Sequence, residues 1–135
     1  MFIGDNDNIV RYCGPRQISK DRTKILHPAF MLRKSELNLS VNWVEFFNTE
    51  ADPLIKICKD LSNCLNLSKN GTLALISVGR IRNIKGYKLN VVHEEGEKNP
   101  SHSGVTNLPT SEQLKEAFAA AIKITKIVNE IIPIP

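Results

Sequence analysis

The sequence predicts an α+β domain in which a small, mostly antiparallel sheet is packed by two main helices, at 52–65 and 111–131. Short apolar or alternating runs bounded by turn residues are typical of strands. Two longer segments carry apolar residues at helical spacing. The composition, with 41% hydrophobic and 24% charged residues in a chain of 135, is that of an ordinary globular protein. We expect a flexible end over 1–8, a single globular domain over 9–132 and a tail at 133–135.

Three segments in the first third of the chain are predicted to be strands. Residues 8–13 are mainly apolar and end at a Gly-Pro pair, which stops a regular element. Residues 29–33 precede a polar turn. Residues 37–41 alternate in character, so Leu37 is expected on the core face and Ser40 on the opposite face.

Two further strands are predicted in the middle of the chain. Residues 72–81 form an almost unbroken apolar run, which is typical of a central strand. Residues 88–93 alternate and follow the turn at Lys85-Gly86, so the two segments are expected to form an antiparallel hairpin. Residues 94–109 are polar and rich in Gly, Pro, Asn and Ser, which predicts an ordered functional loop.

Both helices are predicted from caps and apolar spacing. Asp52-Pro53 supplies a cap and a first helical residue. The second helix is expected to begin at a capping box of Thr110 and Gln113. It is apolar around much of its circumference, so its Ile-rich end is expected to meet another chain. One core-facing stripe is predicted on the first helix, consisting of Leu54, Cys58, Leu61 and Leu65.

The net charge of 18 − 14 = +4 is scattered along the chain. The densest basic stretch, 16–34, is able to lie against phosphates, and a solvated surface is its more ordinary role. Basic and aromatic residues are not interleaved as in single-strand binders, so a nucleic-acid partner is possible but not indicated.

The cysteine count and the hydrophobic pattern predict where in the cell the protein is found. Three cysteines, an odd number, together with an acidic start at 1–9, predict a reducing, cytoplasmic compartment. The longest nearly apolar run, 72–78, is far shorter than the roughly 20 residues that span a bilayer, so we expect no membrane association.

The most informative polar stretch is Asn99-Pro100-Ser101-His102-Ser103-Gly104, which places an imidazole between two hydroxyls. A histidine exchanges protons near neutral pH, and loops on rigid scaffolds often carry such chemistry. The alternative is that His102 stabilises its loop by hydrogen bonds to the backbone. No partner at the spacing of a catalytic triad accompanies it.

The chain also contains residue types that bind metal ions. His93, Glu94, Glu95 and His102 lie close in sequence but lack the ligand spacing of zinc sites. Cys58 and Cys64 are six residues apart, which places them on different faces of a helix. We therefore expect no metal, and the absence of glycine-rich nucleotide motifs indicates no cofactor.

A second set of polar residues runs the length of the chain. Arg11, Ser40 and an acidic group of Glu94, Glu95 and Glu97 follow one another in that order. This order resembles the arginine, serine and glutamate arrangement of ADP-ribosyltransferases. The resemblance implies that Arg11 would hold a dinucleotide phosphate, Ser40 would support the site, and Glu95 or Glu97 would orient a ribose.

Several short motifs together resemble a pattern in small bacterial proteins to which no activity is attached. The likeness spans roughly residues 9–122 and rests on Arg11-Tyr12, Ala29-Phe30, Leu39-Ser40-Val41-Asn42-Trp43, Gly79-Arg80-Ile81 and Asn99 to Val105. It implies a stand-alone bacterial domain in which Arg11, Ser40 and His102 are polar landmarks that approach one another.

The leading hypothesis is an intracellular bacterial domain that acts as a binding or accessory module within a multi-protein system. A polar pocket of Arg11, Ser40, Asn99, Ser101 and His102 would hold an anionic ligand or a partner segment. One alternative is a nucleotide-using enzyme with Glu95 or Glu97 as its acidic group. Another is a structural subunit that forms a homo-oligomer, or binds a protein partner, through the Ile-rich C-terminal helix.

Overall fold

A computed structural model describes residues 2–135 and places six strands in one sheet with the order β4-β5-β2-β1-β3-β6. Every pairing in it is antiparallel, so the predicted α+β class is confirmed. The strands are β1 (Asn8–Cys13), β2 (Leu39–Trp43), β3 (Thr72–Ser77), β4 (Asn90–His93), β5 (His102–Thr106) and β6 (Glu130–Pro133). The α-helices are α1 (Pro53–Leu61), α2 (Val78–Arg82) and α3 (Leu114–Thr125), and the 3₁₀-helices are η1 (Pro15–Gln17), η2 (His27–Phe30) and η3 (Val44–Phe47).

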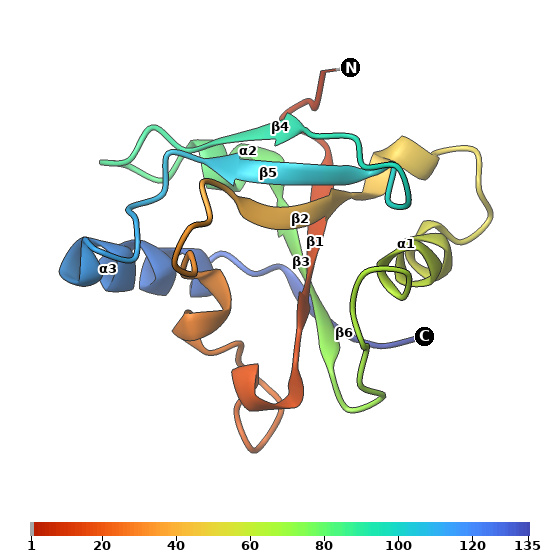
Figure 1. The fold of residues 1–135 in the computed structure, drawn as a ribbon, viewed down its shortest axis with the longest axis horizontal. Helices are drawn as coiled ribbons and strands as arrows, with labels where there is room; N and C mark the ends of the chain where they lie inside the picture. The colour runs from red at the N-terminus through yellow and green to blue at the C-terminus, as the bar shows by residue number, and fades with distance from the viewer. Residues whose placement is uncertain (1) are drawn as a thin grey trace.

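The sheet changes direction where β1 meets β2. β1 pairs with β3 along its whole length, whereas it pairs with β2 only through Ile9 opposite Trp43 and Val10 opposite Asn42. Beyond these two pairs the strands diverge. As a result β4, β5 and β2 cross the direction of β1, β3 and β6 (Figure 1).

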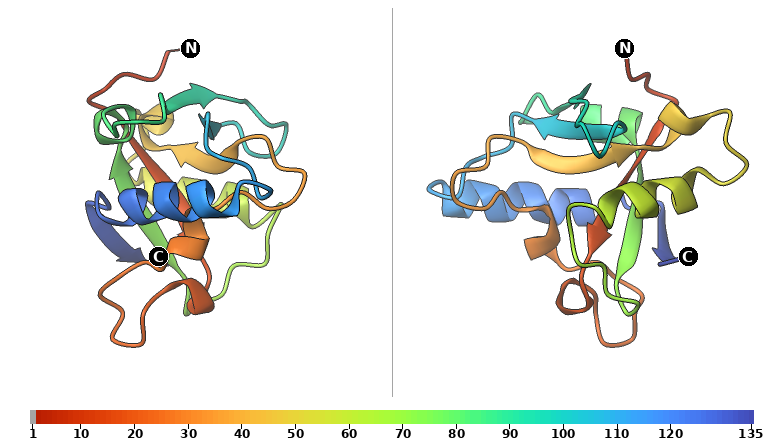
Figure 2. Two further views of the ribbon diagram at one scale, coloured as in Figure 1. Left: turned by 90° about the vertical axis from the view of Figure 1, so that its left-hand side faces the viewer. Right: turned by 45° about the vertical axis from the view of Figure 1, so that its right-hand side comes forward.

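The two longer helices pack on opposite faces of β1. Successive side chains of a strand point to opposite faces, so Ile9 and Cys13 join one apolar cluster and Val10 joins another. The first cluster contains Ala120, Ala121 and Ile124 of α3. The second contains Ile57, Cys58 and Leu61 of α1. The views in Figure 2 show the two helices on different sides of the crossing strands.

The predicted start of α1 is confirmed, because the Asp52 side chain accepts a hydrogen bond from the Ile55 N–H and Pro53 is the first helical residue. The helix ends at Leu61, short of the predicted 65. Cys58 and Leu61 are buried as expected, while Leu65 is 47% exposed because it lies beyond the helix.

The prediction of a helix over 111–131 is wrong at both ends. α3 begins at Leu114, and its N-cap residue is Gln113 in place of the predicted Thr110. α3 stops at Thr125, and residues 130–133 form β6, which pairs with β3. The β-branched side chains of Ile131 and Ile132 favour a strand. Pro133 cannot donate a ladder hydrogen bond, which suits an edge strand. The Ile-rich segment expected to meet another chain is therefore part of the sheet.

Other local predictions are also corrected. Residues 29–33 are not a strand, because Ala29 and Phe30 belong to the 3₁₀-helix η2, whose first turn contains Pro28 with its fixed φ. The strand expected over 72–81 ends at Ser77, where α2 begins. The hairpin with 88–93 is absent, because β4 pairs with β5 instead. β5 itself lies inside the predicted loop 94–109, and Leu37, expected in the core, is 86% exposed.

Arg82 joins the N-terminal segment to the outer edge of β4. Its guanidinium donates to the carbonyl oxygens of Ile3 (2.7 Å) and Val91 (3.2 Å), and it bonds the side chains of Asp5 and Asn90 (2.8 Å each). Ile3 is buried in the same cluster as α3. These contacts join the first residues, predicted as a flexible end, to the sheet. Among residues 2–135 no helix has the length and apolar character to cross a membrane.

We expect Arg82→Ala to destabilise the fold by roughly 1–3 kcal/mol, because two carbonyl groups lose a charged donor. Arg80→Ala, in the same short helix, removes an exposed side chain with no hydrogen bond in the described chain and should change stability by less than about 0.5 kcal/mol. Urea denaturation of both variants measures the difference. Equal midpoints would contradict the role given to Arg82.

Candidate functional site

The register of the sheet places three side chains in one row. Val10 of β1 lies opposite Asn42 of β2, and Asn42 lies opposite His102 of β5. Residues directly opposite each other in adjacent strands share a face of the sheet. Ser40 lies two residues from Asn42, so it shares this face as well. The row therefore brings residues from widely separated segments to one surface.

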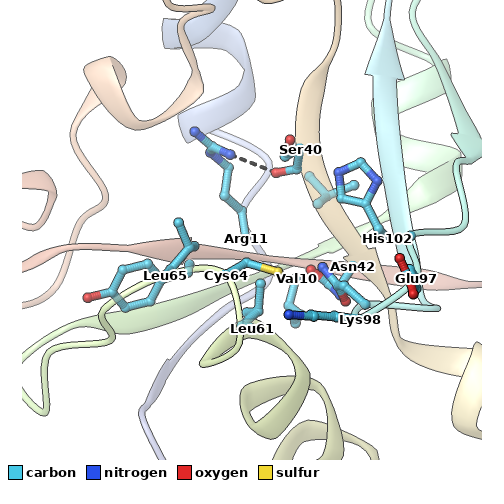
Figure 3. A pocket seen from close by; sticks show the side chains of 14 residues that line it. Val10, Arg11, Ser40, Asn42, Leu61, Cys64, Leu65, Glu97, Lys98 and His102 are labelled. Atoms are coloured by element: carbon cyan, nitrogen blue, oxygen red, sulfur yellow. Dashed lines mark hydrogen bonds between the residues drawn. The ribbon is translucent and has the colours of Figure 1, made fainter.

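A pocket of about 370 Å³ opens on this face, where β1 and β2 diverge. Two of its sides come from the strands themselves, and the others come from the segment after α1 and the β4–β5 loop. Figure 3 shows Arg11 reaching toward Ser40, with His102 near Ser40 and with Leu61, Cys64 and Leu65 on the opposite side. The lining residues are Val10, Arg11, Tyr12, Ser40, Val41, Asn42, Leu61, Cys64, Leu65, Gly96, Glu97, Lys98, Asn99 and His102.

Arg11 spans the gap between the two strands. Its Nε–H donates to the Ala29 carbonyl oxygen at 2.5 Å, and its Nη1 donates to the Ser40 carbonyl oxygen at 2.6 Å. The guanidinium thus bonds β2 beyond the last residue pair that joins β1 and β2. Burial lowers the pKa of Arg11 from its ordinary value, but an arginine in a protein keeps its charge.

The charge of Arg11 is not neutralised by an ion pair. Among residues 2–135 the salt bridges join Lys56 to Asp60 and Arg82 to Asp5, and neither includes Arg11. A guanidinium has five N–H groups, and Arg11 uses two of them, so 5 − 2 = 3 remain for another partner. Arg11 is half-buried, so these N–H groups lie where water or an added group is able to reach them.

A buried polar network holds the β4–β5 loop on β2. The Asn42 side-chain amide donates to Asn99 Oδ1 at 2.5 Å and to Ser101 Oγ at 2.8 Å. The Ser103 hydroxyl donates to the Ser101 carbonyl oxygen at 3.1 Å. All four residues are buried. Because buried polar groups are costly when unpaired, this network fixes the loop that carries Asn99 and leads into His102 of β5.

One ring nitrogen of His102 makes a hydrogen bond to the backbone of the β4–β5 loop. Nδ1 lies 2.8 Å from the Glu94 carbonyl oxygen, and since a carbonyl only accepts, Nδ1 carries the hydrogen. Nε2 is then an acceptor in the neutral ring and a donor in the protonated ring. The expected backbone hydrogen bond of His102 is present, and the side chain also lines the pocket.

Four of the five predicted ligand residues line one pocket, namely Arg11, Ser40, Asn99 and His102. Ser101 does not line it; its side chain is fully buried under the loop. Of the acidic residues in the alternative prediction, Glu97 lines the pocket and Glu95 does not.

Sequence reasoning missed several pocket residues. Asn42 shares a face with Ser40, so two polar residues on one side of a strand were a usable signal for a polar site. Tyr12 follows Arg11 in β1, and its hydroxyl accepts a hydrogen bond from the Ser68 N–H at 2.8 Å. Leu61 and Cys64 line the pocket only because α1 packs on the sheet. No local sequence pattern predicts that packing.

The cysteines and the acidic residues do not form a metal site. Within the described chain no three His, Cys, Asp or Glu side chains lie close enough to hold a metal ion. Cys13 and Cys58 are buried, and Cys64 is exposed at the pocket. Burial raises the pKa of the Cys13 thiol to about 11 and also raises the pKa of Cys58.

A scan against protein-family models, a search of curated proteins and a search of solved structures each found no match to this chain. The two resemblances described from the sequence therefore stay predictions.

We expect a thiol reagent at pH 8 to label Cys64 rapidly and to leave the other two cysteines unmodified. With a pKa of about 11, only about one Cys13 thiol in a thousand is ionised at pH 8. Labelling of Cys13 and Cys58 also requires the fold to open, so it should be at least about 100-fold slower. Mass spectrometry of tryptic peptides measures each rate. Equal labelling of Cys13 and Cys64 would contradict the packing.

Proposed function

We propose that this chain is a binding module whose pocket between β1 and β2 holds an anionic group on Arg11. The observation that carries the proposal is the charged guanidinium of Arg11, a half-buried residue of the pocket lining, which has three N–H groups without a hydrogen bond and forms no salt bridge in the described chain. Phosphate and carboxylate groups match the planar fork of an arginine. The accessory role in an intracellular bacterial system is part of the same proposal.

The other charged groups of the pocket support an anionic ligand. Lys98 and Glu97 are neighbours in the β4–β5 loop and carry opposite charges, so Arg11 sets the net charge of the lining at +1. Ser40, Asn42 and Asn99 supply neutral hydrogen-bonding groups beside it. Such a combination, with an apolar wall and a few convergent polar groups, is typical of small-molecule sites.

Binding is favoured over catalysis by the surroundings of His102. A nucleophilic mechanism needs a hydroxyl or thiol within hydrogen-bond reach of its base. In the described chain no Ser, Thr or Cys side chain bonds to the His102 ring, whose Nδ1 bonds a backbone carbonyl. His102 is therefore assigned to the ligand, as a donor or acceptor through Nε2.

We expect inorganic phosphate to bind wild-type protein with a dissociation constant of about 1–10 mM, as befits a single small anion. Arg11→Gln should weaken binding at least tenfold, about the loss of one charged hydrogen bond. Arg11→Lys keeps the charge but lacks the fork, and should bind with intermediate affinity. Chemical shifts of the backbone amides of Ser40 and His102, followed by NMR during a phosphate titration, measure each affinity.

The matched control is Lys69→Gln, which removes one exposed positive charge outside the pocket and should bind like the wild type. Thermal unfolding of each variant shows whether it is folded before the titration. No shift in wild-type protein at about 50 mM phosphate, or equal affinities for wild type and a folded Arg11→Gln variant, would refute the proposal.

A further inference from the structure

A second concavity lies against the first and shares part of its wall. It has a volume of about 620 Å³. Arg11, Tyr12, Ser40 and Leu65 line both concavities, so the two meet at the Arg11–Ser40 hydrogen bond. The remaining lining residues of the second concavity are Gly14, Pro15, Arg16, Gln17, Arg33, Glu36 and Asn66.

This second concavity is more basic than the first. Arg11, Arg16 and Arg33 give three positive charges, and Glu36 gives one negative charge, so the lining carries 3 − 1 = +2. The Glu36 carboxylate accepts the backbone N–H of Arg33 at 2.5 Å. Neither Arg16 nor Arg33 takes part in a salt bridge in the described chain. Three arginines therefore line one hollow, and Glu36 is the one carboxylate among the lining residues.

We propose that the two concavities form one site for a ligand that contains a diphosphate group, with one phosphate on Arg11 and the other on Arg16 and Arg33. This inference rests on the proposed function, because it takes Arg11 as the first anion site. It adds a second anion site and the chemical class of the ligand. It also gives a role to part of the basic stretch 16–34.

The charge count favours a phosphate-containing ligand over a lone carboxylate. A lone carboxylate carries one negative charge and would leave part of the +2 uncompensated, whereas two linked phosphates carry two or more. All three cations are arginines, which bind phosphate oxygens in pairs of hydrogen bonds more specifically than lysine does. The shared wall places the two anion sites side by side, as adjacent phosphates require.

The first concavity has space for an organic group attached to the diphosphate. Its volume of about 370 Å³ lies in the range of small-molecule pockets. Val10, Val41 and Leu61 give it apolar walls, and Asn99 adds an amide. A nucleoside diphosphate and inorganic pyrophosphate share the chemistry of the proposed group, and the experiment distinguishes between them.

The test compares phosphate with pyrophosphate, and AMP with ADP, at one pH and one ionic strength, by the NMR titration described above. We expect pyrophosphate to bind about tenfold tighter than phosphate, because it gains a second arginine-bound phosphate. In the double variant Arg16→Gln/Arg33→Gln, that preference should disappear while phosphate affinity stays within about twofold of wild type. The matched control is Lys20→Gln/Lys34→Gln, which removes two exposed charges from the same basic stretch outside both concavities and should keep the preference.

The outcomes separate this inference from the proposed function. Phosphate binding without a preference for pyrophosphate, or a preference that persists in the arginine double variant, would overturn the diphosphate site alone. Absence of any binding by wild-type protein would overturn the proposed function as well. If the preference is present, ADP binding tighter than pyrophosphate identifies a nucleoside diphosphate as the ligand. Equal affinities identify the diphosphate group without a nucleoside.

Discussion

The structure depends on one side chain that bridges two strands where their backbones have separated. β1 and β2 share only two residue pairs, after which their hydrogen-bonding edges diverge. Arg11 donates to the carbonyl oxygens of Ser40 and Ala29 across that divergence. A neutral side chain of the same length would satisfy fewer carbonyl groups, and a carboxylate would repel them. The guanidinium therefore connects the two strands across the gap. The same group gives the lining of the pocket its net positive charge.

Different elements pack on the two faces of β1 beside this gap. α3 packs against Ile9 and Cys13 on one face of β1, which leaves Val10 to the cluster around α1. The segment after α1 and the β4–β5 loop then form the remaining walls. The Asn42–Asn99–Ser101 network holds that loop in place through buried hydrogen bonds. A polar pocket with a charged wall is thus a consequence of how the crossing strands are joined, and its chemistry suits an anion.

The sequence predicted the fold class and much of the site, but not the long-range pairing. Asn8–Cys13 and the Asp52-Pro53 start of α1 follow from local residue types, because turn and cap preferences act over a few residues. β5 escaped detection because Ser103 and Gly104 are small and not typical of strands, although their surroundings bury them. The register that places Asn42 beside His102 joins segments about 60 residues apart, and no local pattern specifies it. Arg11, Ser40, Asn99 and His102 were predictable as unusual polar residues, whereas Leu61 and Cys64 required the packing of α1.

The central claim is that Arg11, which forms no salt bridge in the described chain, binds an anion at the wall of the pocket. A crystal structure of the protein grown with selenate tests it most directly, because selenium scatters anomalously and marks the anion. The account predicts an anomalous peak whose oxygens lie within about 2.7–3.2 Å of the Arg11 guanidinium nitrogens, with the Ser40 contact retained. An Arg11 paired with a carboxylate of the chain, and no selenate in the pocket, would contradict it.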